Sequence, residues 1–203
     1  MSFFERNRAS LRERGYDPDR LPPGQYFTER FPVLHVGDVP QIDPQTWDLS
    51  VFGLVRAPRH FTLAELQALP HASIVTDIHC VTKWSKFDMP WEGVRFRDVL
   101  ALCDPDPLGQ FIVEHAEFGY TTNLPLADAM ADDVLIAWAY DGKPIEPKHG
   151  GPVRMVVPAR YFWKSAKWLT GIELVAHDQP GFWERNGYHN AGDPWREERF
   201  WGD

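Results

Sequence analysis

The sequence DIHCVTKWS, residues 77–85, places Cys80 shortly after a largely apolar run at residues 72–75. This pattern predicts a strand that carries Cys80. The chain has only two cysteines, and a thiolate is either a nucleophile or a soft metal ligand. Taken alone, a cysteine after a strand is more typical of a small buried hydrophobic residue. Its role therefore depends on what the rest of the chain places beside it.

A second dense stretch is HGGPVRMVVP, residues 149–158, which is followed by SAKW, residues 165–168. Glycines ahead of a β-branched strand allow the backbone to come close to a ligand. Arg154, Lys167 and one or two histidines could bind an anionic phosphate through charge-assisted hydrogen bonds. One thiolate could then hold a metal that the same ligand coordinates. This combination describes a pterin-dithiolene cofactor with one protein sulfur.

Common templates of other sites are absent from the sequence. There is no Cys-x-x-Cys or His-Glu-x-x-His for zinc, no P-loop or Gly-x-Gly-x-x-Gly fingerprint, and no Cys-x-x-Cys-His haem attachment. A Cys–His hydrolase stays open, because a histidine close to Cys80 in space could lower the pKa of its thiol.

The composition is that of an ordinary globular protein with an unusual share of aromatic residues. The chain has 203 residues, 43% of them hydrophobic, and nine tryptophans with thirteen phenylalanines suggest an aromatic core or pocket. A net charge of −8 argues against a nucleic-acid partner, which requires a basic face. No apolar run is long enough to span a membrane and no secretory h-region is present, so we expect a cytoplasmic protein.

The pattern of elements predicts a mixed α+β fold built around sheets. Residues 1–24 are expected to form an N-terminal arm, and residues 25–203 a single domain, in which the segment 25–41 is packed but irregular. The C-terminal aromatic residues are expected to pack back on the body. Strands are expected at 47–53, from 72 to Cys80, at 111–113, 134–140 and 153–157, and in a segment that ends at 175. Short helices are expected at 62–69, 97–102 and 125–133, and a turn at 91–96.

Together, the residues around Cys80 and the two later stretches resemble the sulfite oxidase superfamily of mononuclear molybdenum enzymes. The chain is particularly similar to the small catalytic subunit of bacterial protein-methionine-sulfoxide reductases. The resemblance covers roughly Phe31 to Trp195. It implies a sulfite oxidase-type fold and a Mo-molybdopterin cofactor.

The resemblance also implies roles for particular residues. Cys80 matches the cysteine that ligates molybdenum, and Tyr188 matches an active-site tyrosine. The cofactor-contacting positions that it implies are His35, His149, Arg154, Ser165, Ala166 and Lys167. By residue type alone, His35 would be a satisfied core histidine, and Arg154 and Lys167 would be ordinary surface cations.

This chain departs from plain sulfite oxidases at positions where those enzymes carry arginines that hold the sulfite anion. The corresponding places have Lys83, Trp84, Ser85 and Val33. The Trp–Ser pair resembles the sulfoxide reductase instead. We therefore expect a molybdenum oxidoreductase for a small sulfoxide, N-oxide or sulfite-like substrate, with an unknown electron-transfer partner. A metal-free Cys/His hydrolase or acyltransferase using Cys80 and a molybdopterin carrier without turnover remain alternatives.

Overall fold

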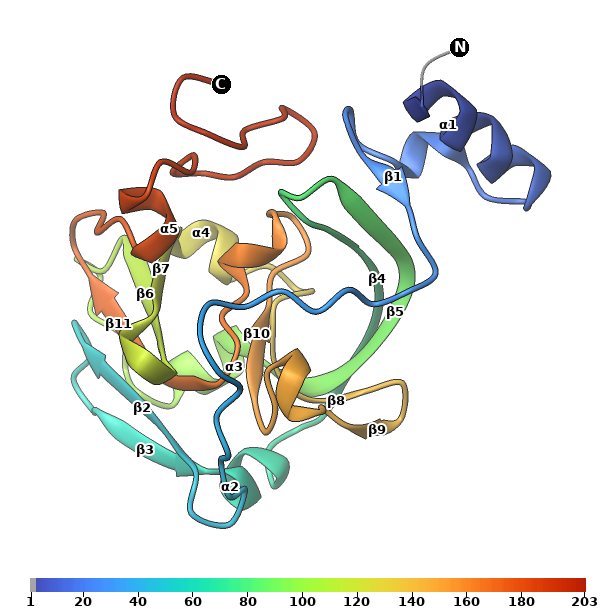
Figure 1. Cartoon of the computed structure of the whole chain (residues 1–203). Coiled ribbons are helices and arrows are strands. Elements are labelled where there is room, and N and C mark those ends of the chain that lie inside the picture. The colour runs from blue at the N-terminus through green and yellow to red at the C-terminus, as the bar shows by residue number, and fades with distance from the viewer. Residues whose placement is uncertain (1–2) are drawn as a thin grey trace.

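The computed structural model describes residues 3–203 and consists of short helices around two β-sheets (Figure 1). The α-helices are α1 (Phe3–Glu13), α2 (Leu63–Gln67), α3 (Phe96–Ala101), α4 (Leu126–Ala129) and α5 (Phe182–Arg185). Short 3-10 turns are η1 (Pro18–Arg20), η2 (Glu117–Gly119), η3 (Pro147–His149) and η4 (Phe162–Lys164). The strands are β1 (Tyr26–Phe27), β2 (Asp48–Gly53), β3 (Arg59–Thr62), β4 (Ala72–His79), β5 (Trp84–Arg95), β6 (Phe111–Ala116), β7 (Thr121–Pro125), β8 (Leu135–Tyr140), β9 (Lys143–Pro144), β10 (Arg154–Val156) and β11 (Leu169–Val175).

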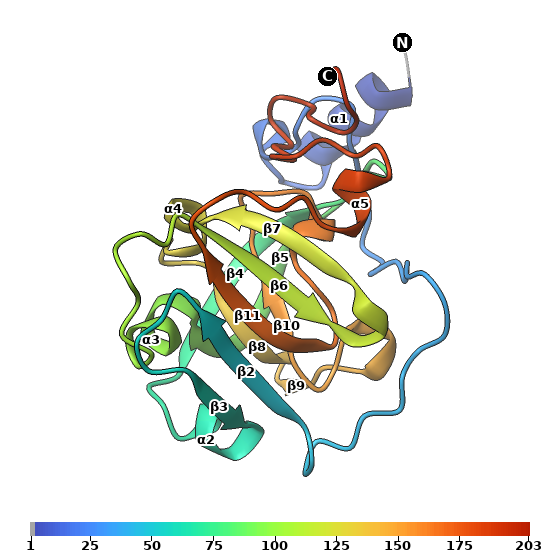
Figure 2. The same ribbon diagram turned by 90° about the vertical axis from the view of Figure 1, so that its left-hand side faces the viewer.

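The two sheets pack face to face, and the predicted mixed α+β class is confirmed. The first sheet has the order β1-β5-β8-β10, with β4 paired to β5 and β9 paired to β8. The second has the order β3-β2-β11-β6-β7, in which β11 runs parallel to β2 and antiparallel to β6. Figure 2 shows the second sheet in front of the first.

The larger hydrophobic core fills the space between these sheets. In β2, Leu49 and Val51 are buried whereas Asp48 and Gly53 are exposed, the period-two pattern of a strand with one face on a core. Ile172 of β11 and Ile136 of β8 belong to the same cluster from opposite sheets. Each such side chain contributes about 1.5–3 kcal/mol on burial. The sheets are therefore a rigid support for the loops at their edges.

The expected turn at residues 91–96 is wrong, because β5 continues through this stretch to Arg95. Its first part pairs with β4 and its last part with β8, and the register shifts between Glu92 and Gly93. A Cβ at Gly93 would lie 2.2 Å from the carbonyl oxygen of Ile136. The glycine thus allows close approach of two strands, which the sequence pattern cannot distinguish from a turn.

Most other predicted elements are confirmed, with different lengths. The capping box of α2 is present, since Thr62 Oγ1 accepts from the Glu65 N–H and the Glu65 carboxylate accepts from the Thr62 N–H. The predicted helix at 125–133 is only the four residues of α4. β7 is not among the predicted strands, because an edge strand with polar residues and a proline carries a weak strand signal. Within residues 3–203, no helix has both the length and the apolar character needed to cross a membrane.

Both ends of the described chain lie on the same side of the molecule (Figure 2). Leu11 of α1 and Leu21 are buried in a small cluster with Phe87 of β5. Arg20 adds a salt bridge to Asp77 at 2.6 Å. The division into an arm (1–24) and one domain (25–203) stays a prediction.

The C-terminal aromatic residues pack back only in part. Trp183 and Tyr188 are half-buried. Trp195, Phe200 and Trp201 are instead 51%, 49% and 68% exposed.

Candidate functional site

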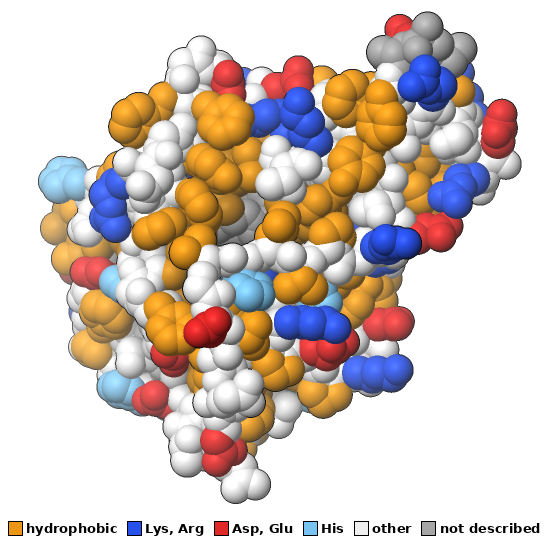
Figure 3. Space-filling view, in the orientation of Figure 1, with side chains coloured by type: hydrophobic (Ala, Val, Ile, Leu, Met, Phe, Trp, Pro, Cys, Tyr) orange, Lys and Arg blue, Asp and Glu red, His pale blue; other side chains and the backbone are white. Residues whose placement is uncertain are grey.

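A cavity of about 400 Å³ opens where the loops at one edge of the two sheets meet. Figure 3 shows a hollow in this face, bordered largely by hydrophobic side chains. The lining comes from segments far apart in sequence, at residues 34–36, 80–82, 117–120, 154, 162–168 and 182–188. Seven of the eight residues predicted for the site line it, namely His35, Cys80, Arg154, Ser165, Ala166, Lys167 and Tyr188.

Cys80 lies in the tight turn between β4 and β5. Its N–H donates to the Trp84 carbonyl at 2.9 Å, and its own carbonyl accepts from the Lys83 N–H at 2.9 Å. The turn places Lys83 in the left-handed region, with φ of 76°. The thiol is 8% exposed, and Thr82 Oγ1 donates to Sγ at 3.2 Å. Burial raises the pKa of the Cys80 thiol.

Arg154 is a fully buried cation at the edge of the cavity. Its guanidinium donates to three carbonyl oxygens, those of Met155, His149 and Ser165, at 3.1, 2.6 and 2.9 Å. It also lies 4.0 Å from the centre of the Phe162 ring. Burial lowers the pKa of Arg154 to about 9. Three of its five N–H groups are used, so two remain for a ligand.

Lys167 supplies a second cation. Its Nζ donates to the carbonyl oxygens of Leu34 and Lys148 at 2.9 and 3.0 Å. Burial, and next the charge of Arg154, lower the pKa of Lys167 to about 7. His149 is 9% exposed and stacks on Phe31 at 3.9 Å, but it is not among the residues that line the cavity. Burial first, and then Lys167 and Arg154, lower the pKa of His149 to about 4.

These charges fit an anionic ligand. Within residues 3–203, neither Arg154 nor Lys167 forms a salt bridge with a carboxylate; both bond to neutral carbonyl oxygens. Buried cations are costly without a counter-charge. Gly150 and Gly151 bring the backbone close to this region, since a Cβ at Gly150 would lie 2.8 Å from Lys167 Cβ. One thiol, two cations and a glycine pair therefore suit a cofactor that carries both a metal and a phosphate.

Comparison with known proteins bears on this interpretation. The chain matches the family described as "Oxidoreductase molybdopterin binding domain" over residues 36–183. The chain belongs to this family. It is therefore an oxidoreductase, and its cofactor is molybdenum-molybdopterin.

Individual relatives agree with the predicted resemblance. "Uncharacterized oxidoreductase YuiH" of Bacillus subtilis is 49% identical over 89% of this chain and 92% of that protein. "Putative protein-methionine-sulfoxide reductase subunit YedZ1" of Azospira oryzae is 30% identical over 87% of this chain and 70% of that protein. Mitochondrial sulfite oxidase of Drosophila melanogaster is 28% identical over 84% of this chain and 35% of that protein.

The fold has a match among solved structures. The sulfane dehydrogenase SoxCD of Paracoccus pantotrophus superposes with a TM-score of 0.68 at 21% identity, over 76% of this chain and 44% of that one. The predicted sulfite oxidase-type fold of this molybdopterin-binding domain is confirmed.

Ser165 and Ala166 also line the cavity. Ser165 Oγ accepts from the Val157 N–H at 2.9 Å, so its hydroxyl supports the chain after β10. The Ala166 N–H donates to Glu114 Oε2 at 2.8 Å. Glu114 is fully buried, and burial raises the pKa of its carboxyl group to about 8. The segment that carries Lys167 is thus held in place from the second sheet.

Tyr188 lines the cavity from the segment that follows α5. It stacks on Trp183 at 4.7 Å and packs edge-on against Trp163 at 5.0 Å. Burial, and next the charge of a Cys80 thiolate, raise the pKa of the Tyr188 hydroxyl. Tyr188 and Cys80, which are far apart in sequence, therefore share one cavity in this molybdopterin-binding domain.

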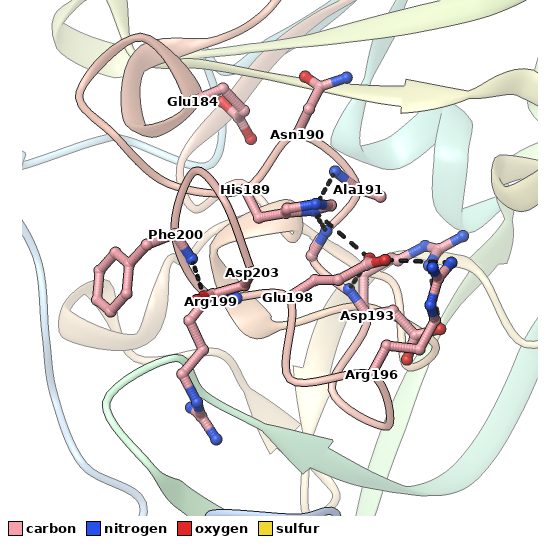
Figure 4. Close-up of polar contacts among 12 residues, drawn as sticks. Glu184, His189, Asn190, Ala191, Asp193, Arg196, Glu198, Arg199, Phe200 and Asp203 are labelled. Carbon is pink, nitrogen blue, oxygen red and sulfur yellow. Dashed lines mark hydrogen bonds and ion pairs between the residues drawn. The ribbon is translucent and has the colours of Figure 1, made fainter.

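A polar network holds the C-terminal segment that follows Tyr188 (Figure 4). Glu198, which is 4% exposed, accepts from the Asp193 N–H at 3.1 Å and pairs with Arg196 at 3.2 Å. His189 Nδ1 accepts from the N–H of Ala191 at 3.1 Å. The segment has little regular structure, so these side chains determine its path.

One expectation for a histidine is corrected. His35 is exposed rather than buried, its Nδ1 contacts the carbonyl of Gly37 at 2.9 Å, and its ring lies 5.8 Å from Trp168. It sits at the mouth of the cavity because segment 34–36 crosses the surface there. His79 points away from Cys80 and is hydrogen-bonded to Ser85 Oγ at 2.8 Å. Among the described residues, Thr82 is the side chain hydrogen-bonded to the Cys80 sulfur.

The sequence reasoning missed several residues of the cavity. Thr82, two positions after Cys80 in a tight turn, carried a usable signal, because its hydroxyl can reach the sulfur. Phe118, which has φ of 59° and is 69% exposed, carried none. Lys83, Trp84 and Ser85 do not line the cavity, and Trp84 and Ser85 are buried behind the turn.

Proposed function

We propose that this domain transfers an oxygen atom or an electron pair to or from a small substrate at a molybdenum ligated by the Cys80 thiolate. One observation carries the proposal: Cys80 lines the same cavity as Arg154 and Lys167, two cations that bond to neutral carbonyl groups. A molybdenum held by a pterin dithiolene and one thiolate supplies two-electron redox chemistry at a single metal.

In this proposal the residues around the cavity divide into two groups. Arg154, Lys167 and His149 hold the phosphate and pterin, and the backbone of Ser165 and Ala166 closes on them. Tyr188 lies beside Cys80 and donates a hydrogen bond to the substrate oxygen. His35 contacts the cofactor from the mouth of the cavity. Burial of Cys80 keeps water away from the ligand sulfur.

The cavity favours an uncharged substrate, a sulfoxide or N-oxide, over a sulfite-like anion. Its lining is rich in aromatic side chains, namely Phe118, Phe162, Trp163, Trp168, Phe182 and Trp183. The cations in the lining are Arg154 and Lys167, which we assign to the cofactor. The relative from Azospira oryzae, named a putative protein-methionine-sulfoxide reductase subunit, supports the same choice. Because that relative is named a subunit, we propose that electrons come from a separate, unidentified protein.

The test replaces each cysteine in turn, in a host that makes the cofactor. Cys80→Ser should remove the thiolate features from the Mo(V) paramagnetic-resonance spectrum and abolish dye-coupled reduction of dimethyl sulfoxide. Cys103→Ser is the matched control, because Cys103 is also buried but donates to the Val99 carbonyl at 3.7 Å and does not line the cavity. Spectra of Cys80→Ser that equal those of the wild type would reject the ligation.

The alternatives predicted from the sequence have weaker support. A Cys/His hydrolase or acyltransferase needs a base at the thiol, whereas the side chain bonded to Cys80 Sγ is Thr82 and burial favours the neutral thiol. A molybdopterin carrier without turnover predicts bound molybdenum that no dye couple reduces and reoxidises. Turnover by the wild type in the same dye assay separates the carrier from the oxidoreductase.

A further inference from the structure

The turn that carries Cys80 is held from behind by side chains from both ends of the chain. Gln25 comes from the segment before β1, and Arg199 comes from the C-terminal segment. Both positions lie outside residues 36–183, the part that matches the family. The side chains that hold the turn therefore come from segments beyond the matched region.

Gln25 supports the carbonyl of the cysteine itself. It is 1% exposed, and its Nε2 donates to the Cys80 carbonyl oxygen at 3.0 Å. The next residue continues the support, because the Tyr26 N–H donates to the Lys83 carbonyl at 2.8 Å. The N-terminal segment thus bonds to the first and last residues of the turn.

Arg199 supports the next carbonyl along the turn. It is 6% exposed, and its Nη1 donates to the Val81 carbonyl at 2.9 Å. Its Nη2 donates to the Pro23 carbonyl at 3.2 Å, which joins the C-terminal segment to the N-terminal one. In Figure 4, Arg199 extends away from the network of Glu198, whereas Arg196 belongs to that network.

The two terminal segments are in tight contact where they meet the turn. A Cβ at Gly24 would lie 2.2 Å from Glu197 Oε1 and 3.0 Å from Arg199 Nη2. The guanidinium of Arg199 also lies 4.9 Å from the centre of the Tyr161 ring. A buried arginine with this many partners has little freedom, so it is a rigid support for the turn.

We propose that Gln25 and Arg199 are positioning residues that fix the turn Cys80–Lys83 and thereby the direction of the Cys80 sulfur. The turn needs such support because Lys83 adopts a left-handed conformation, which is unfavourable for a residue with a side chain. This inference rests on the proposed ligation of molybdenum by Cys80. It adds residues that touch neither substrate nor cofactor.

The test compares the wild type with Arg199→Met, Gln25→Met and Arg196→Met in protein purified with its cofactor. Arg196 is the matched control, since its side chain is 75% exposed and pairs with Glu198 instead of the turn. Gln25→Met removes the donor, whereas the Cys80 carbonyl keeps the hydrogen bond from the Lys83 N–H. It therefore decides the question if Arg199→Met does not fold.

Two readouts report on the turn. The first is hydrogen exchange of the Lys83 amide, which is bonded to the Cys80 carbonyl, with the amide of Ile172 in the centre of β11 as reference. The second is the Mo(V) paramagnetic-resonance spectrum. For Arg199→Met, exchange at Lys83 should rise by about tenfold to a hundredfold relative to Ile172, the range expected for lost hydrogen bonds to a charged group. For Gln25→Met the rise should be smaller, about tenfold or less, because the lost donor is neutral.

The Mo(V) spectrum should also change in Arg199→Met and Gln25→Met but not in Arg196→Met. Arg199→Lys should restore part of the protection, because it keeps a charged donor. Equal increases at Lys83 and Ile172, or unchanged Mo(V) spectra in both turn variants, would overturn the positioning role. Identical Mo(V) spectra for the wild type and Cys80→Ser would instead reject the proposed ligation, which is a separate result.

Discussion

The buried pair of Lys164 and Glu184 offers a sharp test of how the wall with Tyr188 is held. Both side chains are 1% exposed and their charged atoms lie 2.6 Å apart. Lys164 Nζ also donates to the backbone and side-chain oxygens of Asn123, at 3.0 and 2.8 Å. Glu184 Oε1 accepts in addition from Thr122 and Trp163. Because Glu184 lies in α5, the pair anchors the segment that carries Tyr188 to the second sheet.

Lys164→Met leaves the Glu184 carboxylate buried without its counter-charge, which costs about 3–5 kcal/mol. For a chain of this size, each 1 kcal/mol lowers the melting temperature by about 2–4 °C, so the expected loss is roughly 10 °C. Burial lowers the pKa of Lys164 in spite of Glu184, so desolvation outweighs the attraction within the pair. The double variant Lys164→Met, Glu184→Gln should therefore recover most of the lost stability.

The assay is thermal unfolding, with urea unfolding as a second measure of the free energy. Lys148→Met is the matched control, because Lys148 pairs with Glu146 at 2.8 Å but the two side chains are 48% and 64% exposed. The control should lose no more than about 1 kcal/mol. Equal losses for Lys164→Met and Lys148→Met would refute the argument from burial, as would a double variant as unstable as Lys164→Met alone.

Two further predictions concern Glu114 and Gly150, which contact the lining residues Ala166 and Lys167. The pKa of Glu114 is about 8 in the folded protein and near 4.5 in the unfolded chain. The folded state therefore binds more protons between these values, so the free energy of unfolding falls as the pH rises from about 4.5 to about 8 and is constant above that. Glu114→Gln cannot ionise, so its melting temperature relative to the wild type should rise between about pH 5 and pH 8, and a constant difference would contradict this. Gly150 has φ of 105°, and a Cβ there would lie 2.8 Å from Lys167 Cβ, whereas Gly142 has φ of 67° and open space around it. Gly150→Ala should therefore lower the free energy of unfolding by about 1–3 kcal/mol more than Gly142→Ala does. It should also reduce the amount of bound molybdenum. Similar melting temperatures and metal contents for the two alanine variants would argue against a close approach at Gly150.

Exposed apolar side chains surround part of the cavity opening. Leu34, Val36 and Phe118 line the cavity and are 51%, 56% and 69% exposed. Phe118 and Trp168 both have positive φ angles and lie edge to face at 6.5 Å. Such conformations cost free energy for residues with side chains, so the surrounding structure must hold Phe118 and Trp168 in them.

The local sequence was sufficient for much of the fold. The period-two burial of β2, the capping box at Thr62 and the strand before Cys80 all depend on neighbours within a few residues. The co-occurrence of Cys80, Arg154 and Lys167 in their motifs was enough to predict the cofactor class. These features are local, or they follow the order of motifs along the chain, and both are visible in a sequence.

Contacts between distant segments were decided only by the tertiary structure. The sequence could not show that Gly93 marks close strand packing instead of a turn, because the carbonyl it faces belongs to Ile136. Burial of Arg154 and exposure of His35 likewise depend on which segments cover them. Gln25 and Arg199 meet at the Cys80 turn from segments far apart in the chain. The motifs along the chain were enough to predict the cofactor class, whereas the packing of Gln25 and Arg199 against the turn decided how Cys80 is held, because such contacts leave no periodic pattern.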